Sequence, residues 1–129
     1  MNKKIINKSL PEMWFSCMYG LGASQYMKAT YEQFLLKHNL PIPNIRIMGS
    51  DCLEKNVGNS REQFSNAKII VDWLGDSNYG INKKKYAPDG NYFSYNSDKY
   101  IFEGANIESI MLDIYNFYND AINKDTKLL

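Results

Sequence analysis

Few side chains in this sequence have the types and spacing that metal binding requires. The chain has two cysteines, Cys17 and Cys52, and one histidine, His38. A structural zinc site needs about four cysteine, histidine or carboxylate ligands. Asp72 and Asp76 are four residues apart, but the glycine between them favours a solvated helix end over a metal site. We therefore expect neither a metal nor a cofactor.

A cysteine nucleophile needs a histidine or a helix N-terminus to stabilise its thiolate. Cys17 lies among aromatic residues and a methionine, which predicts a buried and inert thiol. Cys52 follows residues 49–51, a loop after a predicted strand, and is better placed if a helix starts there. His38 closes an apolar helical stripe and favours the dipole of that helix. The sequence favours two reduced thiols, and it leaves open a chemical role for Cys52 or for the 49–51 loop.

One segment, residues 79–100, interleaves cations with aromatic rings. It has four lysines and two aspartates, a local charge of +2. Tyrosine side chains are enriched at protein interfaces, and rings beside cations also suit stacking on single-stranded bases. A solvated lysine run next to a hairpin whose alternate rings pack on the core is the third interpretation. The residues that we predict to bind a partner are Lys83, Lys84, Lys85, Tyr86, Tyr92 and Tyr95.

Four segments have the apolar spacing or the capping residues of helices. Capping boxes precede two of them, at Ser9 and Ser60, and Asn106 caps the last. The last helix has the clearest apolar face, on which Ile110 and Ile114 are predicted to be buried. The predicted helices cover residues 13–19, 24–38, 60–74 and 107–123, and residues 124–129 are predicted to fray.

Strand signals are fewer. The alternating residues 45–48 predict one short strand. The aromatic segments 92–95 and 100–103 flank polar residues and predict a β-hairpin. Together these elements predict one α+β domain over residues 1–129, with about four helices, one short strand and a C-terminal β-hairpin followed by an amphipathic helix. Residues 67–73 fit a buried strand as well as a helix, and that alternative would create a small Rossmann-like α/β unit.

Composition excludes several classes of protein. The net charge is +1, whereas domains that bind duplex nucleic acid carry a clear basic excess. The N-terminus lacks the apolar core of a signal peptide, and no run of about 18 apolar residues exists to span a membrane. We therefore expect a cytoplasmic protein that binds neither duplex nucleic acid nor a membrane. Abundant lysine, asparagine, isoleucine and tyrosine indicate AT-rich codons, and hence a low-GC bacterium or one of its phages or plasmids.

The absence of a catalytic cluster favours a protein that works by binding. We expect a small inhibitor from a bacterial mobile element that docks on a bacterial protein and blocks it, as anti-defence and immunity proteins do. One alternative is a small Rossmann-like α/β enzyme that acts on a nucleotide or a sugar and depends on Ser50 or Asp51. The second alternative is a module that binds single-stranded nucleic acid.

Overall fold

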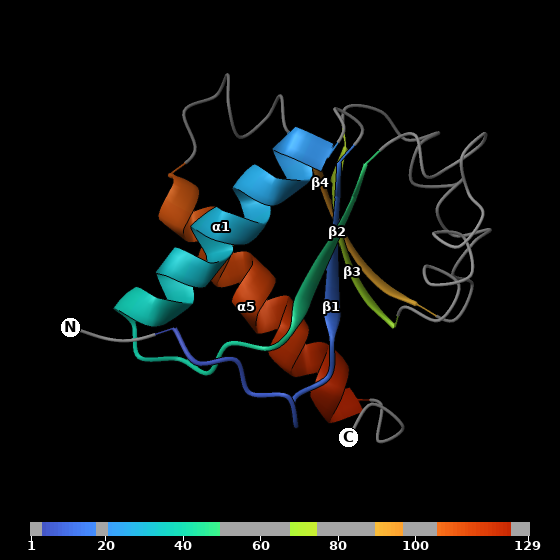
Figure 1. The fold of residues 1–129 in the computed structure, drawn as a ribbon. Coiled ribbons are helices and arrows are strands. Elements are labelled where there is room, and N and C mark those ends of the chain that lie inside the picture. Colours follow the sequence, from blue (N-terminus) through green and yellow to red (C-terminus); the bar gives the residue numbers. More distant parts are fainter. Residues whose placement is uncertain (1–3, 18–20, 50–67, 75–89, 97–105, 125–129) are drawn as a thin grey trace.

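The computed structural model describes residues 4–17, 21–49, 68–74, 90–96 and 106–124. Within these ranges the chain forms four strands and two helices. In chain order they are β1 (Met13–Cys17), α1 (Leu21–Lys37), β2 (Ile45–Gly49), β3 (Ile69–Leu74), β4 (Asn91–Asn96) and α5 (Ile107–Lys124). All neighbouring strands are parallel, and their order across the sheet is β2-β1-β3-β4 (Figure 1). The described fold is therefore of the α/β type.

This arrangement shows that the α+β prediction is wrong. Residues 13–17 and 69–74, which the sequence predicts in helices, are the strands β1 and β3. Residues 92–95 lie in β4, which pairs in parallel with β3, so the predicted hairpin is not the fold of this region. The other predicted arm, residues 100–103, lies outside the described residues. Strands of a parallel sheet are buried on both faces, so they are short apolar runs without the alternation that identifies a strand.

Three other predicted elements are confirmed. Residues 24–38 and 107–123 correspond to α1 and α5, and residues 45–48 correspond to β2. The strand alternative for residues 67–73 also agrees with β3. Asn106 is the N-cap of α5, because its side-chain oxygen accepts a hydrogen bond from the backbone N–H two residues later at 2.8 Å.

The two faces of the sheet have different neighbours. Figure 1 shows α1 and α5 on the same side of the sheet. Alternate side chains of each strand pack against these helices, and we call this side the helix-covered face. It contributes to the core the side chains of Met13, Phe15, Ile45, Ile69 and Val71, with Ile47 and Phe93 partly buried. The residues between them in sequence point to the other side, which we call the opposite face.

Each helix buries one stripe of side chains. In α1 the buried residues Met27, Tyr31 and Leu35 are four residues apart and therefore lie on one face. In α5 the predicted burial of Ile110 and Ile114 is confirmed, with exposed fractions of 4% and 0%. Neither of these two described helices has the length and hydropathy needed to cross a membrane.

The segment before β1 is tied to distant parts of the chain. The backbone N–H of Asn7 donates to the carbonyl of Ile42 at 2.8 Å, and the Tyr118 hydroxyl donates to the carbonyl of Pro11 at 2.6 Å. Ser9 does not cap a helix as predicted. Its hydroxyl and its backbone N–H both donate to the Asn7 side-chain oxygen, at 2.6 and 3.0 Å, which stabilises a turn instead.

Candidate functional site

The order of the strands creates a switch point between β1 and β3. From β1 the chain continues through α1 to β2, on one side of β1, and from β3 it continues to β4, on the other side. In open parallel sheets, ligands bind outside the carboxyl ends of strands whose connections diverge in this way. The residues near the ends of β1 and β3 are therefore the first candidates for a functional site.

Two rows of side chains cross the opposite face here. The first row, which we call the aromatic row, contains Arg46, Trp14, Ile70 and Tyr92 in register. Nearer the carboxyl ends, Ser16 of β1 is in register with Asp72 of β3, and we call these two residues the polar pair. The polar pair spans the boundary between β1 and β3, which is the switch point.

The polar pair is buried. Ser16 is 2% exposed and Asp72 is 0% exposed. Within the described part of the chain, the hydroxyl of Ser16 has no hydrogen-bond partner. A buried hydroxyl without a partner costs about 1–3 kcal/mol, and taking a carboxylate out of water costs several kcal/mol. Polar groups that a fold retains at such a cost near the end of a strand are candidates for ligand binding.

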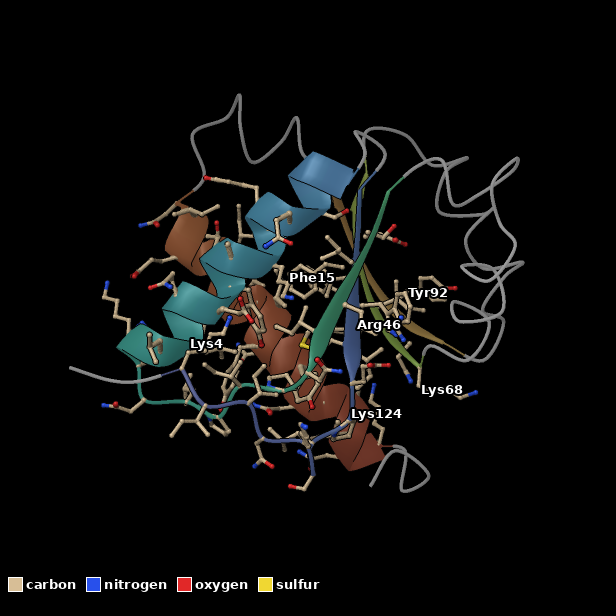
Figure 2. The ribbon with its side chains drawn as sticks, viewed as in Figure 1. Lys4, Phe15, Arg46, Lys68, Tyr92 and Lys124 are labelled. Carbon is tan, nitrogen blue, oxygen red and sulfur yellow. The ribbon has the colours of Figure 1, made fainter. Side chains whose placement is uncertain are left out.

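Tyr92 adds a phenol to this region. Figure 2 shows Tyr92 and Arg46 on the side of the sheet away from α1 and α5. Burial, and after it the negative charge of Asp72, raise the pKa of Tyr92 well above its usual value. The phenol therefore stays protonated at neutral pH and keeps its O–H group as a hydrogen-bond donor.

The other end of the aromatic row is fixed by polar contacts. The Arg46 guanidinium lies over the Trp14 ring, 4.4 Å from its centroid, which is a cation–π contact. The indole N–H of Trp14 donates to one carboxylate oxygen of Glu12 at 3.1 Å. The second oxygen of Glu12 accepts a hydrogen bond from the side-chain amide of Asn44 at 3.0 Å. These contacts hold the Trp14 ring in one orientation next to the polar pair.

Only two of the six residues predicted to bind a partner lie within the described residues. Lys83, Lys84, Lys85 and Tyr86 lie outside the described residues. Tyr92 and Tyr95 both lie in β4. Tyr92 joins the aromatic row, and Tyr95 is placed only by its backbone, which pairs with Trp73 of β3. Cys52, Ser50 and Asp51 also lie outside the described residues.

Sequence reasoning missed the polar pair. It assigned Asp72 to a solvated helix end, whereas Asp72 is a fully buried residue of β3. A charged residue within the apolar run IIVDWL was the signal that could have identified it, because charged residues are almost never fully buried unless they are paired. Ser16 had no comparable signal, since serine in MWFSC becomes notable only once its neighbour across the sheet is known.

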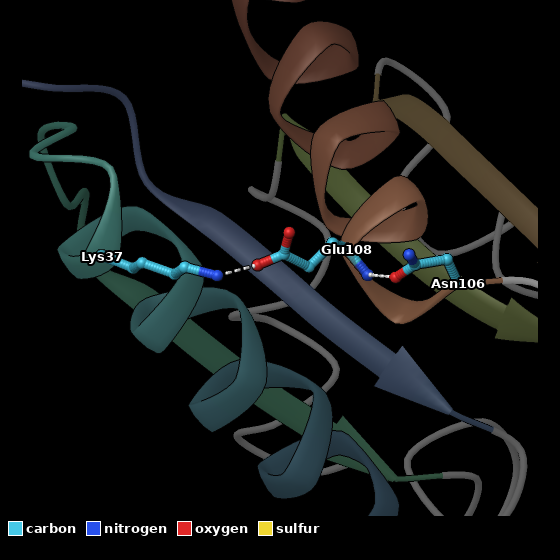
Figure 3. Close-up of polar contacts among 3 residues, drawn as sticks. All are labelled: Lys37, Asn106 and Glu108. Atoms are coloured by element: carbon cyan, nitrogen blue, oxygen red, sulfur yellow. Dashed lines mark hydrogen bonds and ion pairs between the residues drawn. The ribbon is translucent and has the colours of Figure 1, made fainter.

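Two surface cavities lie beside the helices. The first is about 520 Å³ and lies between the end of α1 and the start of α5. Its lining residues are Phe34, His38, Leu40, Asn106, Glu108, Ser109, Leu112 and Tyr115. At its rim the Lys37 ammonium contacts the Glu108 carboxylate at 2.6 Å (Figure 3), and this contact lowers the pKa of Glu108. The second cavity, about 370 Å³, lies between β4 and α5.

Metal-binding groups do not gather in the part of the chain that the structure describes. No three histidine, cysteine, aspartate or glutamate side chains among those residues are close enough to hold one ion. The polar pair with Tyr92 supplies hydrogen-bonding groups instead, namely a carboxylate, a hydroxyl and a phenol. This set is suited to binding a ligand with several hydroxyl or amino groups.

Comparison with known proteins gives little further information. No protein-family model and no curated protein matches the chain. Among solved structures, the chain is similar to the MID domain of the AGO protein QDE-2 from N. crassa. The two chains are 16% identical, the match covers 88% of this chain and 98% of that chain, and the TM-score is 0.42. A TM-score this low does not establish a shared fold.

Proposed function

We propose that the chain is a small α/β domain that binds a polar small molecule, of the nucleotide or sugar class, at the carboxyl ends of β1 and β3. The observation that supports this is the polar pair, a buried serine and a buried aspartate in register at the switch point. Ligand sites occur at that position in open parallel sheets.

The chemistry of the polar pair favours sugars and nucleosides. The Asp72 carboxylate accepts hydrogen bonds only, and neighbouring hydroxyls on a sugar ring donate two of them to one carboxylate. The Ser16 hydroxyl can both donate and accept. Hydrogen bonds to a charged group contribute about 1.5–3 kcal/mol each, so the carboxylate would supply the largest polar contribution to binding.

This proposal corresponds to the fold of the α/β alternative, without assigning it a reaction. The expectation of an inhibitor that docks on a bacterial protein remains a prediction. Four of the six residues on which it was based, Lys83, Lys84, Lys85 and Tyr86, lie outside the described residues.

The test is a thermal-shift screen of nucleosides, nucleotides and simple sugars, followed by calorimetry on any ligand that raises the melting temperature. A ligand at about 100 times its Kd stabilises the folded protein by about 2.7 kcal/mol, so a specific ligand gives a clear shift. We expect Asp72→Asn to weaken binding by about tenfold or more and Ser16→Ala to weaken it less.

The matched control is Asp113→Asn, which makes the same chemical change at an exposed position of α5. It should bind the ligand as the wild type does. The proposal is contradicted if no compound of these classes shifts the melting temperature. It is equally contradicted if Asp72→Asn, shown to be folded by circular dichroism, binds with wild-type affinity.

A further inference from the structure

The cavity between β4 and α5 is a groove at the β4 edge of the described sheet. β4 is the last strand in the order β2-β1-β3-β4, and α5 passes beneath it on the helix-covered face. We call the cavity the β4–α5 groove. Its lining residues are Asn91, Phe93, Asp113, Asn116, Phe117, Asp120, Ala121 and Lys124.

The floor of the β4–α5 groove is aromatic. The rings of Phe93 and Phe117 have centroids 5.4 Å apart with planes tilted by 42°, and both side chains are half-buried. Ala121, 4% exposed, closes the floor next to them. The half-buried Phe117 ring therefore offers its exposed surface to an incoming group.

The helical wall of the groove has an ordered pattern of charge. Asp113, Phe117, Asp120 and Lys124 are spaced at i, i+4, i+7 and i+11, so they form one stripe along α5. Two carboxylates thus flank the Phe117 ring, separated by about 10 Å along the helix axis at 1.5 Å per residue. The lysine follows at one end of the stripe.

The carboxylates of Asp113 and Asp120 differ in their ion pairing from that of Glu108, which lies in the first turn of α5. Glu108 is held by Lys37 at 2.6 Å (Figure 3). Within the described residues, neither Asp113 nor Asp120 is in an ion pair. The negative charge of the groove is therefore available to an external cation.

We propose that the β4–α5 groove binds an extended segment of a partner protein, and that an arginine or lysine of this segment lies over Phe117 between Asp113 and Asp120. A guanidinium stacks on an aromatic ring and donates hydrogen bonds to carboxylates at its edges. The side-chain amide of Asn116 supplies hydrogen bonds to the backbone of the segment, whereas that of Asn91 already donates to the Lys68 carbonyl at 3.2 Å.

Charge complementarity selects this occupant over the others. A nucleic-acid strand would bring phosphates against two carboxylates, which repel them. A purely apolar helix would leave both carboxylates desolvated without a partner, which is costly. Lys124 sets the orientation of the bound segment. It repels a second cation at its end of the groove and favours an acidic residue of the segment there.

The test is a selection of displayed random heptapeptides on the wild-type protein, followed by affinity measurements with the enriched peptides after synthesis. We expect the enriched peptides to share an arginine or a lysine. Asp113→Asn or Asp120→Asn should each weaken their binding by about threefold to tenfold, because each removes one partner of the cation. Lys124→Gln should leave binding of the cation unchanged or strengthen it.

The control is Glu108→Gln, which removes one negative charge from α5 outside the β4–α5 groove and should bind the peptides as the wild type does. All four positions are exposed, so these variants should stay folded. Three results would overturn the proposal: no enriched peptide, enrichment of peptides without a cation, or binding that is insensitive to both aspartate substitutions. Competition by a single-stranded oligonucleotide that depends on the same aspartates would also overturn it.

Discussion

Along β1 and β3 the helix-covered face and the opposite face of the sheet are both buried, yet they are built from different residues. Phe15 and Val71, in register on the helix-covered face, are 1% exposed and apolar. Ser16 and Asp72, the next pair along the same two strands, are just as buried and polar. Packing against α1 and α5 accounts for the first pair. In the second pair the Ser16 hydroxyl has no hydrogen-bond partner within the described residues, and packing does not account for it. The opposite face is therefore where a functional requirement is most evident.

The largest expected effect concerns the helix-covered face. Phe15→Ala should lower the free energy of unfolding by about 3–5 kcal/mol, because it removes a buried ring and leaves a cavity. The centroids of the Phe15 and Tyr31 rings are 5.5 Å apart, so α1 would lose this contact with the centre of the sheet. Denaturant unfolding followed by circular dichroism measures the change. A loss below about 1 kcal/mol would mean that this face is not the main core.

Removal of a buried polar group from the opposite face should change the free energy of unfolding in the opposite direction. Ser16→Ala should raise the free energy of unfolding by about 1 kcal/mol, because it removes a buried hydroxyl that has no hydrogen-bond partner within the described residues. On the same face, Asp72→Asn should lower the pKa of Tyr92, since the negative charge of Asp72 is the second cause of its elevation after burial. Denaturant unfolding and ultraviolet titration measure the two effects.

Asp113→Asn, at an exposed position, serves as the reference and should change stability by less than about 0.5 kcal/mol. If Ser16→Ala is strongly destabilising, the buried hydroxyl stabilises the fold, and the contrast between the two faces loses its functional meaning.

The smallest expected effect lies at the surface, away from both faces. The contact with Lys37 lowers the pKa of Glu108 in the folded protein. Its contribution to stability is therefore present above the unfolded pKa of about 4.3 and is lost as the pH falls through the lower folded value. Glu108→Gln should remove this part of the acid dependence: it should slightly lower the free energy of unfolding at neutral pH and leave it unchanged at a pH below the folded pKa of Glu108. An identical acid profile in both proteins would show that the ion pair contributes nothing.

The extent to which sequence predicts this fold follows from where each element lies. α1 and α5 have one face in the core and one in water, so the spacing of residues such as Ile110 and Ile114 identifies them. β1 and β3 lie in the middle of a parallel sheet, where both faces are buried. Their sequences MWFSC and IIVDWL have no alternation, and short apolar runs of this kind do not distinguish a strand from a helix.

The candidate site was less predictable for a related reason. Tyr92 was selected for its aromatic ring, and it does lie on the opposite face. Ser16 and Asp72 became a pair only through the register of β1 with β3, two strands far apart in the chain. Local patterns contain no information about that register, because parallel strands are not connected by a short turn.

The central place of β1 also has a consequence for how the protein folds. β1 comes first among the strands, but both of its neighbours follow it, β2 after a helix and β3 later still. The sheet therefore cannot grow from a local hairpin, and each pairing closes a long loop, which slows folding. During synthesis the apolar β1 leaves the ribosome before β3 exists to cover its second edge. Transient exposure of such an edge promotes aggregation. The need of this chain for chaperones should therefore depend on how fast the residues between β1 and β3 are translated.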